Sequence, residues 1–175
     1  TPYHDAYGLA LLRPGLYHAD GQILDEVYVA GSFLQSKMYA AGVGCLDCHD
    51  AHSAMRVAEG NAVCTQCHSP AGNPDFPTIT PAEYDAPEHH FHEPGTEGAQ
   101  CKSCHAPESV YMGNDWRADH SFRIPRPDLA AQTGAPDACT ACHADRDAEW
   151  AAAEIVARFP ASDNRGPHYG LTLAQ

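Results

Sequence analysis

Cysteine is the residue that most constrains this chain, because its eight copies occur only as four C-x-x-C pairs. Each pair is followed directly by a histidine, so that the four segments read CLDCH, CTQCH, CKSCH and CTACH. In chain order, motifs one to four cover residues 45–49, 64–68, 101–105 and 139–143. Any fold of the chain has to bring a chemical partner to each of these motifs.

Several chemistries use paired cysteines, and the histidines separate them. The first two pairs have the C-x₂-C-x₁₅-C-x₂-C spacing of a zinc ribbon, but 34 residues separate the last two pairs. Neither zinc nor disulfides explain a histidine after every pair. A redox C-x-x-C motif normally occurs once, near a βαβ pattern.

C-x-x-C-H is the attachment motif of a c-type haem. Both thiols form thioethers with the porphyrin, and the following imidazole becomes the proximal ligand of the iron. We therefore predict four covalently bound haem c groups. The predicted thioether residues are Cys45, Cys48, Cys64, Cys67, Cys101, Cys104, Cys139 and Cys142, and the predicted proximal ligands are His49, His68, His105 and His143.

Eight further histidines are available as second axial ligands, of which four haems need four. His52 follows His49 too closely to reach the opposite face of the same iron, so it should reach a neighbouring haem. Our predicted distal ligands are His18, His52, His92 and His120, with His89 as the runner-up to His92. For each of them the alternative is a surface histidine.

Other residues offer alternative axial ligands or contacts to the haem edge. The terminal histidines His4 and His168 are more typical of the surface, unless a terminus reaches into an adjoining subunit. Methionine is also an axial ligand of c-type haems, and the chain has Met38, Met55 and Met112.

Composition indicates a loop-rich single domain over residues 1–175. Leu, Ile, Val and Phe are sparse, whereas Gly and Pro number 14 each. A chain of this kind needs a core element beyond its own side chains. We expect a mainly α fold with extensive loops and little or no β structure. It should be a small multihaem cytochrome c fold organised around four covalently bound haems.

Local patterns predict where helices and loops lie. Apolar residues at helical spacing predict a helix over 26–41 and another over 136–159. Residues 69–100 hold six prolines and should form a long loop, with one short helix starting at the capping box of residues 80–83. Residues 121–128 should be extended. Arg123 and Arg126 there are candidates to pair with haem propionates, although solvated arginines are equally typical.

Charge and hydropathy limit the partners. The net charge is −13 with histidines neutral, which disfavours nucleic acid and anionic lipid and favours basic redox proteins or cations. No apolar run approaches 18 residues, so we expect no membrane span. Because haem is attached covalently outside the cytoplasmic membrane, we expect a periplasmic or extracellular (secreted) protein.

Three stretches resemble a known family. GSFLQSKMYAAGVGCLDCHDAHS, HHFHEPGTEGAQCKSCH and DHSFRIPRPDL are similar to the carboxy-terminal part of multihaem cytochromes related to the cytochrome c554 group, over residues 16–158. In that group such histidines are haem ligands, which implies the same for His18, His52, His92 and His120. The longer relatives carry further motifs upstream that this chain lacks. Its haem count and loop-rich build also resemble subunits of extracellular cytochrome filaments.

These observations lead to two functional hypotheses. The first is electron transfer, without catalysis, through closely packed and mostly bis-histidine haems. Its partners would be other redox proteins or copies of the chain, as a homo-oligomer or a conductive filament. The alternative is a multihaem redox enzyme that reduces or oxidises a small nitrogen or sulfur oxyanion at an open haem.

Overall fold

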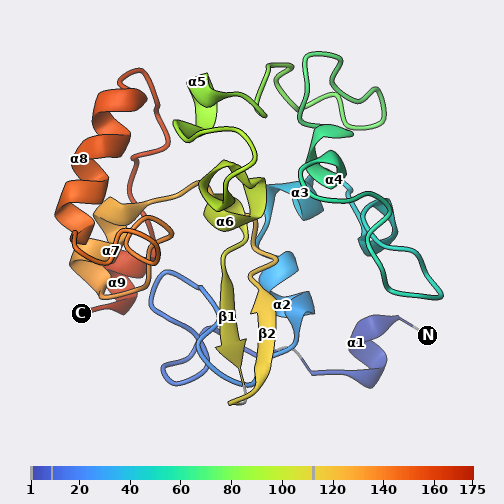
Figure 1. The fold of residues 1–175 in the computed structure, drawn as a ribbon. Helices are drawn as coiled ribbons and strands as arrows, with labels where there is room; N and C mark the ends of the chain where they lie inside the picture. The colour runs from blue at the N-terminus through green and yellow to red at the C-terminus, as the bar shows by residue number, and fades with distance from the viewer. Residues whose placement is uncertain (1, 9, 112) are drawn as a thin grey trace.

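The computed structural model describes residues 2–8, 10–111 and 113–175 (Figure 1). Short helices separated by loops make up the chain, together with one small antiparallel sheet, which confirms the predicted fold class. The helices are α1 (Tyr3–Ala6), α2 (Val29–Phe33), α3 (Lys37–Ala40), α4 (Ala62–Thr65), α5 (Pro87–His90), α6 (Cys101–His105), α7 (Pro127–Thr133), α8 (Ala148–Arg158) and α9 (Gly170–Leu173), with 3₁₀ turns at Cys45–Asp47 and Glu97–Ala99.

The sheet is a hairpin that the sequence analysis did not predict. Strand β1 (Glu108–Tyr111) pairs antiparallel with β2 (Asp115–Ala118), and Glu108 lies opposite Ala118. Each strand is only four residues long, which is too short for an alternating pattern to stand out from the surrounding loops. Gly113 has a φ of +76° and allows the chain to reverse between the strands.

The helix predicted over 26–41 is interrupted. Helices α2 and α3 flank a break at residues 34–36, because the Ser36 side chain accepts a hydrogen bond from the Tyr39 backbone N–H and starts a new helix. The capping box at residues 80–83 forms no helix either. Instead the Tyr84 hydroxyl donates to the Thr80 carbonyl at 2.8 Å, and α5 begins at Pro87.

The helix predicted over 136–159 is shorter than expected, since α8 covers only Ala148–Arg158. Two aspartates explain the difference. The Asp137 carboxylate accepts from the backbone N–H groups of Cys139 and Thr140 and holds motif four in a separate turn. Asp147 caps α8 by accepting from Trp150 N at 2.8 Å. Residues 122–126 contain no helix or strand, but Phe122 has a φ of +45° and is not extended as predicted, and α7 begins at Pro127.

Among the described residues, a small cluster of buried apolar side chains consists of Tyr17, Ile23, Val27 and Tyr111. Away from it, α7 packs against both α8 and α9 (Figure 1). Ser32 of α2 is fully buried and donates its hydroxyl to the buried carboxylate of Asp119, which ties α2 to the segment after β2. The loops that carry the four motifs therefore lie around a scaffold with few large apolar side chains.

Candidate haem sites

Each motif forms one helical turn, which places its cysteines and histidine on one face. The backbone N–H of the motif histidine bonds the carbonyl of the first cysteine at 2.9 Å in motifs one and two and at 2.8 Å in motif four, and motif three is helix α6. Residues three and four apart on a helical turn share a face. Two thiols and one imidazole therefore point the same way, as attachment of a single porphyrin edge requires.

Consecutive motifs are neighbours in space. Gln66 in motif two donates to the Asp47 carbonyl in motif one at 3.0 Å. A side-chain hydrogen bond joins the thiols of Cys64 and Cys101, which belong to motifs two and three. The Cys104 thiol of motif three lies close enough to motif four for the Cys142 thiol to raise its pKa. The four motifs thus follow one another in space in the order of the sequence.

Backbone carbonyls hold four of the imidazoles. The Nδ1 atoms of His49 and His105 lie 2.8 Å from the Ala54 carbonyl oxygen and 2.7 Å from that of Arg123. His120 Nδ1 lies 2.9 Å from the Ala118 oxygen, and His92 Nδ1 lies 2.5 Å from the His90 oxygen. An Nδ1–H donated to a carbonyl fixes the tautomer and leaves Nε2 as the metal-binding nitrogen.

In the part of the chain that the structure describes, three motif histidines face a second histidine. The ring centroids are 6.3 Å apart for His49 and His120, 6.2 Å for His105 and His89, and 6.1 Å for His143 and His92. In each pair the partner comes from outside the motif. His92 and His120 were among the predicted distal ligands, and the runner-up His89 lies beside motif three while His92 lies beside motif four.

These separations are those of two imidazoles bound to one metal ion. A metal–imidazole nitrogen bond is about 2 Å long. Two such bonds on opposite sides of an ion place the nitrogens about 4 Å apart and, since each ring centre lies about 1 Å beyond its nitrogen, the centroids about 6 Å apart. The residues present therefore fit haem iron with two axial histidines. By contrast, no three His, Cys, Asp or Glu side chains of the described residues gather as a zinc site requires.

Motif two differs from the other three. Among the described residues no second imidazole faces His68, and its ring instead packs edge-on against Tyr84, with centroids 5.8 Å apart. The predicted ligand His52 is exposed on a turn that the Asp50 carboxylate holds by accepting from His52 N and Ser53 N. The structure does not bring His52 and His68 together.

The remaining histidines lie elsewhere. His18 is half-buried near Asp20 and Asp119, and no motif imidazole faces it in the part of the chain that the structure describes. The Nδ1 atoms of His90 and His168 accept from the backbone N–H groups of His92 and Gly170. The His4 side chain and Met112 lie outside the described residues. Met38 is half-buried and Met55 is exposed.

Burial affects the protonation of the imidazoles and thiols. It is the main cause of the lowered pKa of His68, His89 and His105, and it keeps these rings neutral and able to bind metal. Burial also raises the pKa of Cys104, and raises that of Cys139 to about 11. Before haem attachment these thiols are therefore protonated at neutral pH.

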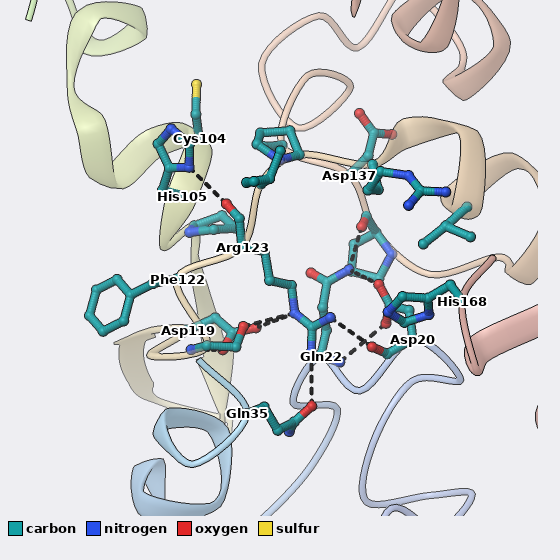
Figure 2. Close-up of a pocket in the computed structure, with 18 of the residues that line it drawn as sticks. Asp20, Gln22, Gln35, Cys104, His105, Asp119, Phe122, Arg123, Asp137 and His168 are labelled. Atoms are coloured by element: carbon teal, nitrogen blue, oxygen red, sulfur yellow. Dashed lines mark hydrogen bonds and ion pairs between the residues drawn. The ribbon is translucent and has the colours of Figure 1, made fainter. Parts of the chain in front are cut away.

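A cavity of about 470 Å³ lies beside motif three, with Cys104 and His105 on one side and His168 on the other (Figure 2). Arg123 crosses it, donating to the Asp20 carbonyl at 2.7 Å and to Gln35 Oε1 at 3.1 Å. Arg126 also lines the cavity and forms a two-pronged ion pair with Asp128. Both arginines thus have protein partners, and their pairing with haem propionates stays a prediction.

Sequence reasoning missed the groups that orient the ligands. The sequence does not reveal the carbonyl acceptors of Ala54, Ala118 and Arg123, because every residue has the same backbone carbonyl group. Tyr84 was not predicted either. It lies sixteen positions after His68 in the sequence, and only the fold of the loop brings its ring to His68.

Comparison with known proteins finds similarity in the first two motifs and in the fold. Residues 37–73, which span motifs one and two, match the family described as Doubled CXXCH motif. None of the curated proteins matches the chain. The crystal structure of the outer cell wall cytochrome OcwA shares the fold, with a TM-score of 0.53 and 16% sequence identity over 82% of this chain. The chain spans 40% of the length of OcwA. In the described residues no helix is both long enough and apolar enough to cross a membrane.

Proposed function

We propose that this chain, a multihaem c-type cytochrome, carries electrons through four haem c groups. One haem would be attached to each motif, so that the haems follow one another in the order of the motifs. One observation carries the proposal, namely that three motif histidines each face a second histidine at the ring separation of two axial ligands. When bound, haem iron supplies one-electron exchange between its ferric and ferrous states. If both histidines of a pair held the same iron, that iron would have no position left for a substrate.

The geometry supports a specific ligand assignment. His120 is the distal partner of His49, His89 that of His105, and His92 that of His143. For His68 we propose His52 as the partner, because the Gln66–Asp47 hydrogen bond brings motifs one and two together and His52 lies three positions after His49. Since the structure leaves His52 on an exposed turn, this ligation would require the turn to move toward His68. The ligand role predicted for His18 stays a prediction without an assigned centre, because no motif imidazole faces it among the described residues.

The chain's own groups perform two tasks in this function. Carbonyl oxygens such as those of Ala54 and Arg123 orient the imidazoles and increase their basicity, which stabilises ferric iron. Burial keeps the imidazoles neutral so that they bind without first releasing a proton. Adjacent motifs keep consecutive redox centres close, so that an electron entering at one end can pass to the other.

The proposed partners are redox proteins with a basic surface, or copies of the chain in a homo-oligomer or filament, outside the cytoplasm. The loop of residues 69–100 carries six exposed acidic side chains and no Lys or Arg. Cationic electron donors should therefore reduce the protein faster than anionic donors of equal potential, and added salt should remove the difference. A filament predicts elongated assemblies in negative-stain images, and compact particles under all conditions would count against it.

Low-temperature EPR of the oxidised protein tests the electron-transfer proposal. We expect low-spin ferric signals that added cyanide or nitrite does not change, because six-coordinate iron has no open position. A haem-to-protein ratio of four, from absorbance and intact mass, should accompany them. High-spin iron at the centres of His49, His105 and His143 would overturn the ligand assignment.

A second candidate function rests on His68. Since the described residues place no second imidazole opposite it, its iron is the one candidate site for a small nitrogen or sulfur oxyanion. This alternative predicts one high-spin signal that shifts with cyanide or nitrite, while the other three centres stay low-spin. If His52→Ala turns a fully low-spin protein into that state, His52 is the ligand and the catalytic alternative is rejected.

A further inference from the structure

The imidazoles of the candidate haem sites are oriented in two different ways. Four of them, His49, His92, His105 and His120, present Nδ1 to a backbone carbonyl. The other three, His68, His89 and His143, make no such hydrogen bond within the described residues. Each of these three contacts an aromatic side chain, as His120 also does through Phe122.

Tyr84 contacts two of these imidazoles. Its ring lies 5.8 Å from that of His68 at 81° and 5.3 Å from that of His89 at 86°, which are both edge-to-face contacts. His68 belongs to motif two, whereas His89 faces His105 of motif three. Tyr84 therefore lies between ligands of two different haems.

The Tyr84 ring is itself held in place. Its hydroxyl donates to the Thr80 carbonyl at 2.8 Å, and its neighbour Asp85 accepts from the Asn61 side chain at 2.7 Å. Asn61 also donates to the Ala99 carbonyl and accepts from Cys101 N, both at 2.9 Å. Since Asn61 directly precedes α4 of motif two and Cys101 begins motif three, one side chain fixes the Tyr84 loop to both motifs.

Trp150 stands in the same relation to motif four. Its ring centroid lies 5.2 Å from that of His143, with the planes at 59°. Asp147 accepts from Trp150 N at the start of α8, and the Arg146 guanidinium lies over the indole ring at 5.6 Å. The hydrogen bond at the Trp150 backbone and the guanidinium over its ring thus both restrict the position of the indole.

We infer that Tyr84 is a positioning residue for His68 and His89, and that Trp150 is one for His143. In these places an aromatic ring takes over the task of the carbonyl acceptor and fixes the rotation of an imidazole about its iron–nitrogen axis. Groups around a ligand that fix its orientation tune the metal it binds. This inference rests on the proposed haem ligation and adds that Tyr84 couples the second and third redox centres.

The test compares Tyr84→Leu with Tyr84→Phe in the haem-loaded protein. Phe keeps the edge-to-face contacts and loses only the hydroxyl, whereas Leu removes the ring. Tyr39→Leu is the matched control, because Tyr39 packs edge-on against Phe33 but touches no candidate ligand. We expect Tyr84→Leu to shift the EPR g-values and the midpoint potentials of two of the four centres. Tyr84→Phe and Tyr39→Leu should keep the wild-type values.

Wild-type EPR and potentials in a Tyr84→Leu protein that carries four haems would overturn the inference. If that variant does not mature, Trp150→Leu provides the test. It should shift the spectrum of one centre and leave three unchanged. An unshifted spectrum would refute the inference that an aromatic ring positions the imidazole. Failure of the proposed function looks different. It would show in the wild-type protein itself, as missing haem or as high-spin iron at the paired sites.

Discussion

His89 and His105 lie with their ring centroids 6.2 Å apart and their planes within 11° of parallel, although they belong to different helices, α5 and α6. Burial lowers the pKa of both rings. A proline-rich loop therefore folds back to place a neutral imidazole opposite a motif histidine.

Removing His89 should open the coordination of one centre only. We expect His89→Ala to convert one low-spin signal into a high-spin signal that binds cyanide. His89→Met should restore six-coordination and raise the potential of that centre, because a thioether ligand favours ferrous iron. His168→Ala is the control and should leave all spin states unchanged, because no motif imidazole faces His168 in the described residues. An unaltered spectrum of His89→Ala would contradict the assignment.

Gly98 leaves the space into which the His92 ring fits. A Cβ atom at this position would lie 2.7 Å from His92 Cγ and 2.9 Å from His92 Nε2, closer than real contacts allow. The ring cannot easily retreat, since its Nδ1 is held 2.5 Å from the His90 oxygen. We expect Gly98→Ala to displace His92 from His143 and to perturb the EPR signal and the potential of that centre alone.

Gly166→Ala is the matched control for Gly98→Ala, because a Cβ there meets no heavy atom within 4 Å and the backbone needs no left-handed conformation. It should behave as wild type. Equal spectra for the two variants would mean that His92 does not depend on the space at Gly98.

The sequence was sufficient to predict the chemistry of the motifs, because C-x-x-C-H ties two cysteines and one histidine to one cofactor at fixed spacing. It also placed His92 and His120 among four predicted distal ligands, and these two lie beside a motif histidine, whereas His18 and His52 face none in the described residues. It could not assign partners, because His89 and His92 lie three positions apart and only the turn at Phe91, with a φ of +57°, directs them to different motifs.

Helix ends were predicted less well, for a local reason. Asp137, Asp147 and Ser36 use their side chains to cap or close turns within stretches whose apolar spacing is helical. Such side chains compete with the continuing helix for backbone N–H groups. The outcome depends on packing that a periodic pattern does not contain.

The buried pair of Ser32 and Asp119 should matter for stability. Ser32→Ala removes the hydroxyl that donates to a carboxylate only 3% exposed, and should lower the free energy of unfolding by about 1–3 kcal/mol. Ser53→Ala is the matched control, since Ser53 donates to the exposed Asp50 and its loss should change the same quantity by less than about 0.5 kcal/mol. Urea unfolding measures both, and equal losses would contradict the role of burial.

Mild acid should destabilise the fold through its histidines. Burial lowers the pKa of His18, His68, His89 and His105 below the ordinary value of 6.5. Between the lowered pKa values and 6.5 the unfolded chain binds more protons than the folded one, so stability rises with pH across this window and is lost as pH falls through it. Iron bound to these rings acts in the same direction, because protons compete with it for the nitrogen.

Urea midpoints at about pH 7 and about pH 5.5 check this sign, since unperturbed carboxylates titrate only near pH 4. High salt is needed in both samples, because the net charge of −13 becomes smaller on acidification and relief of self-repulsion would act the opposite way. We expect the lower midpoint at the lower pH, accompanied by growth of high-spin iron as imidazoles leave. A midpoint that stays constant or rises on acidification would show that these histidines are not the neutral, buried groups that the fold makes them.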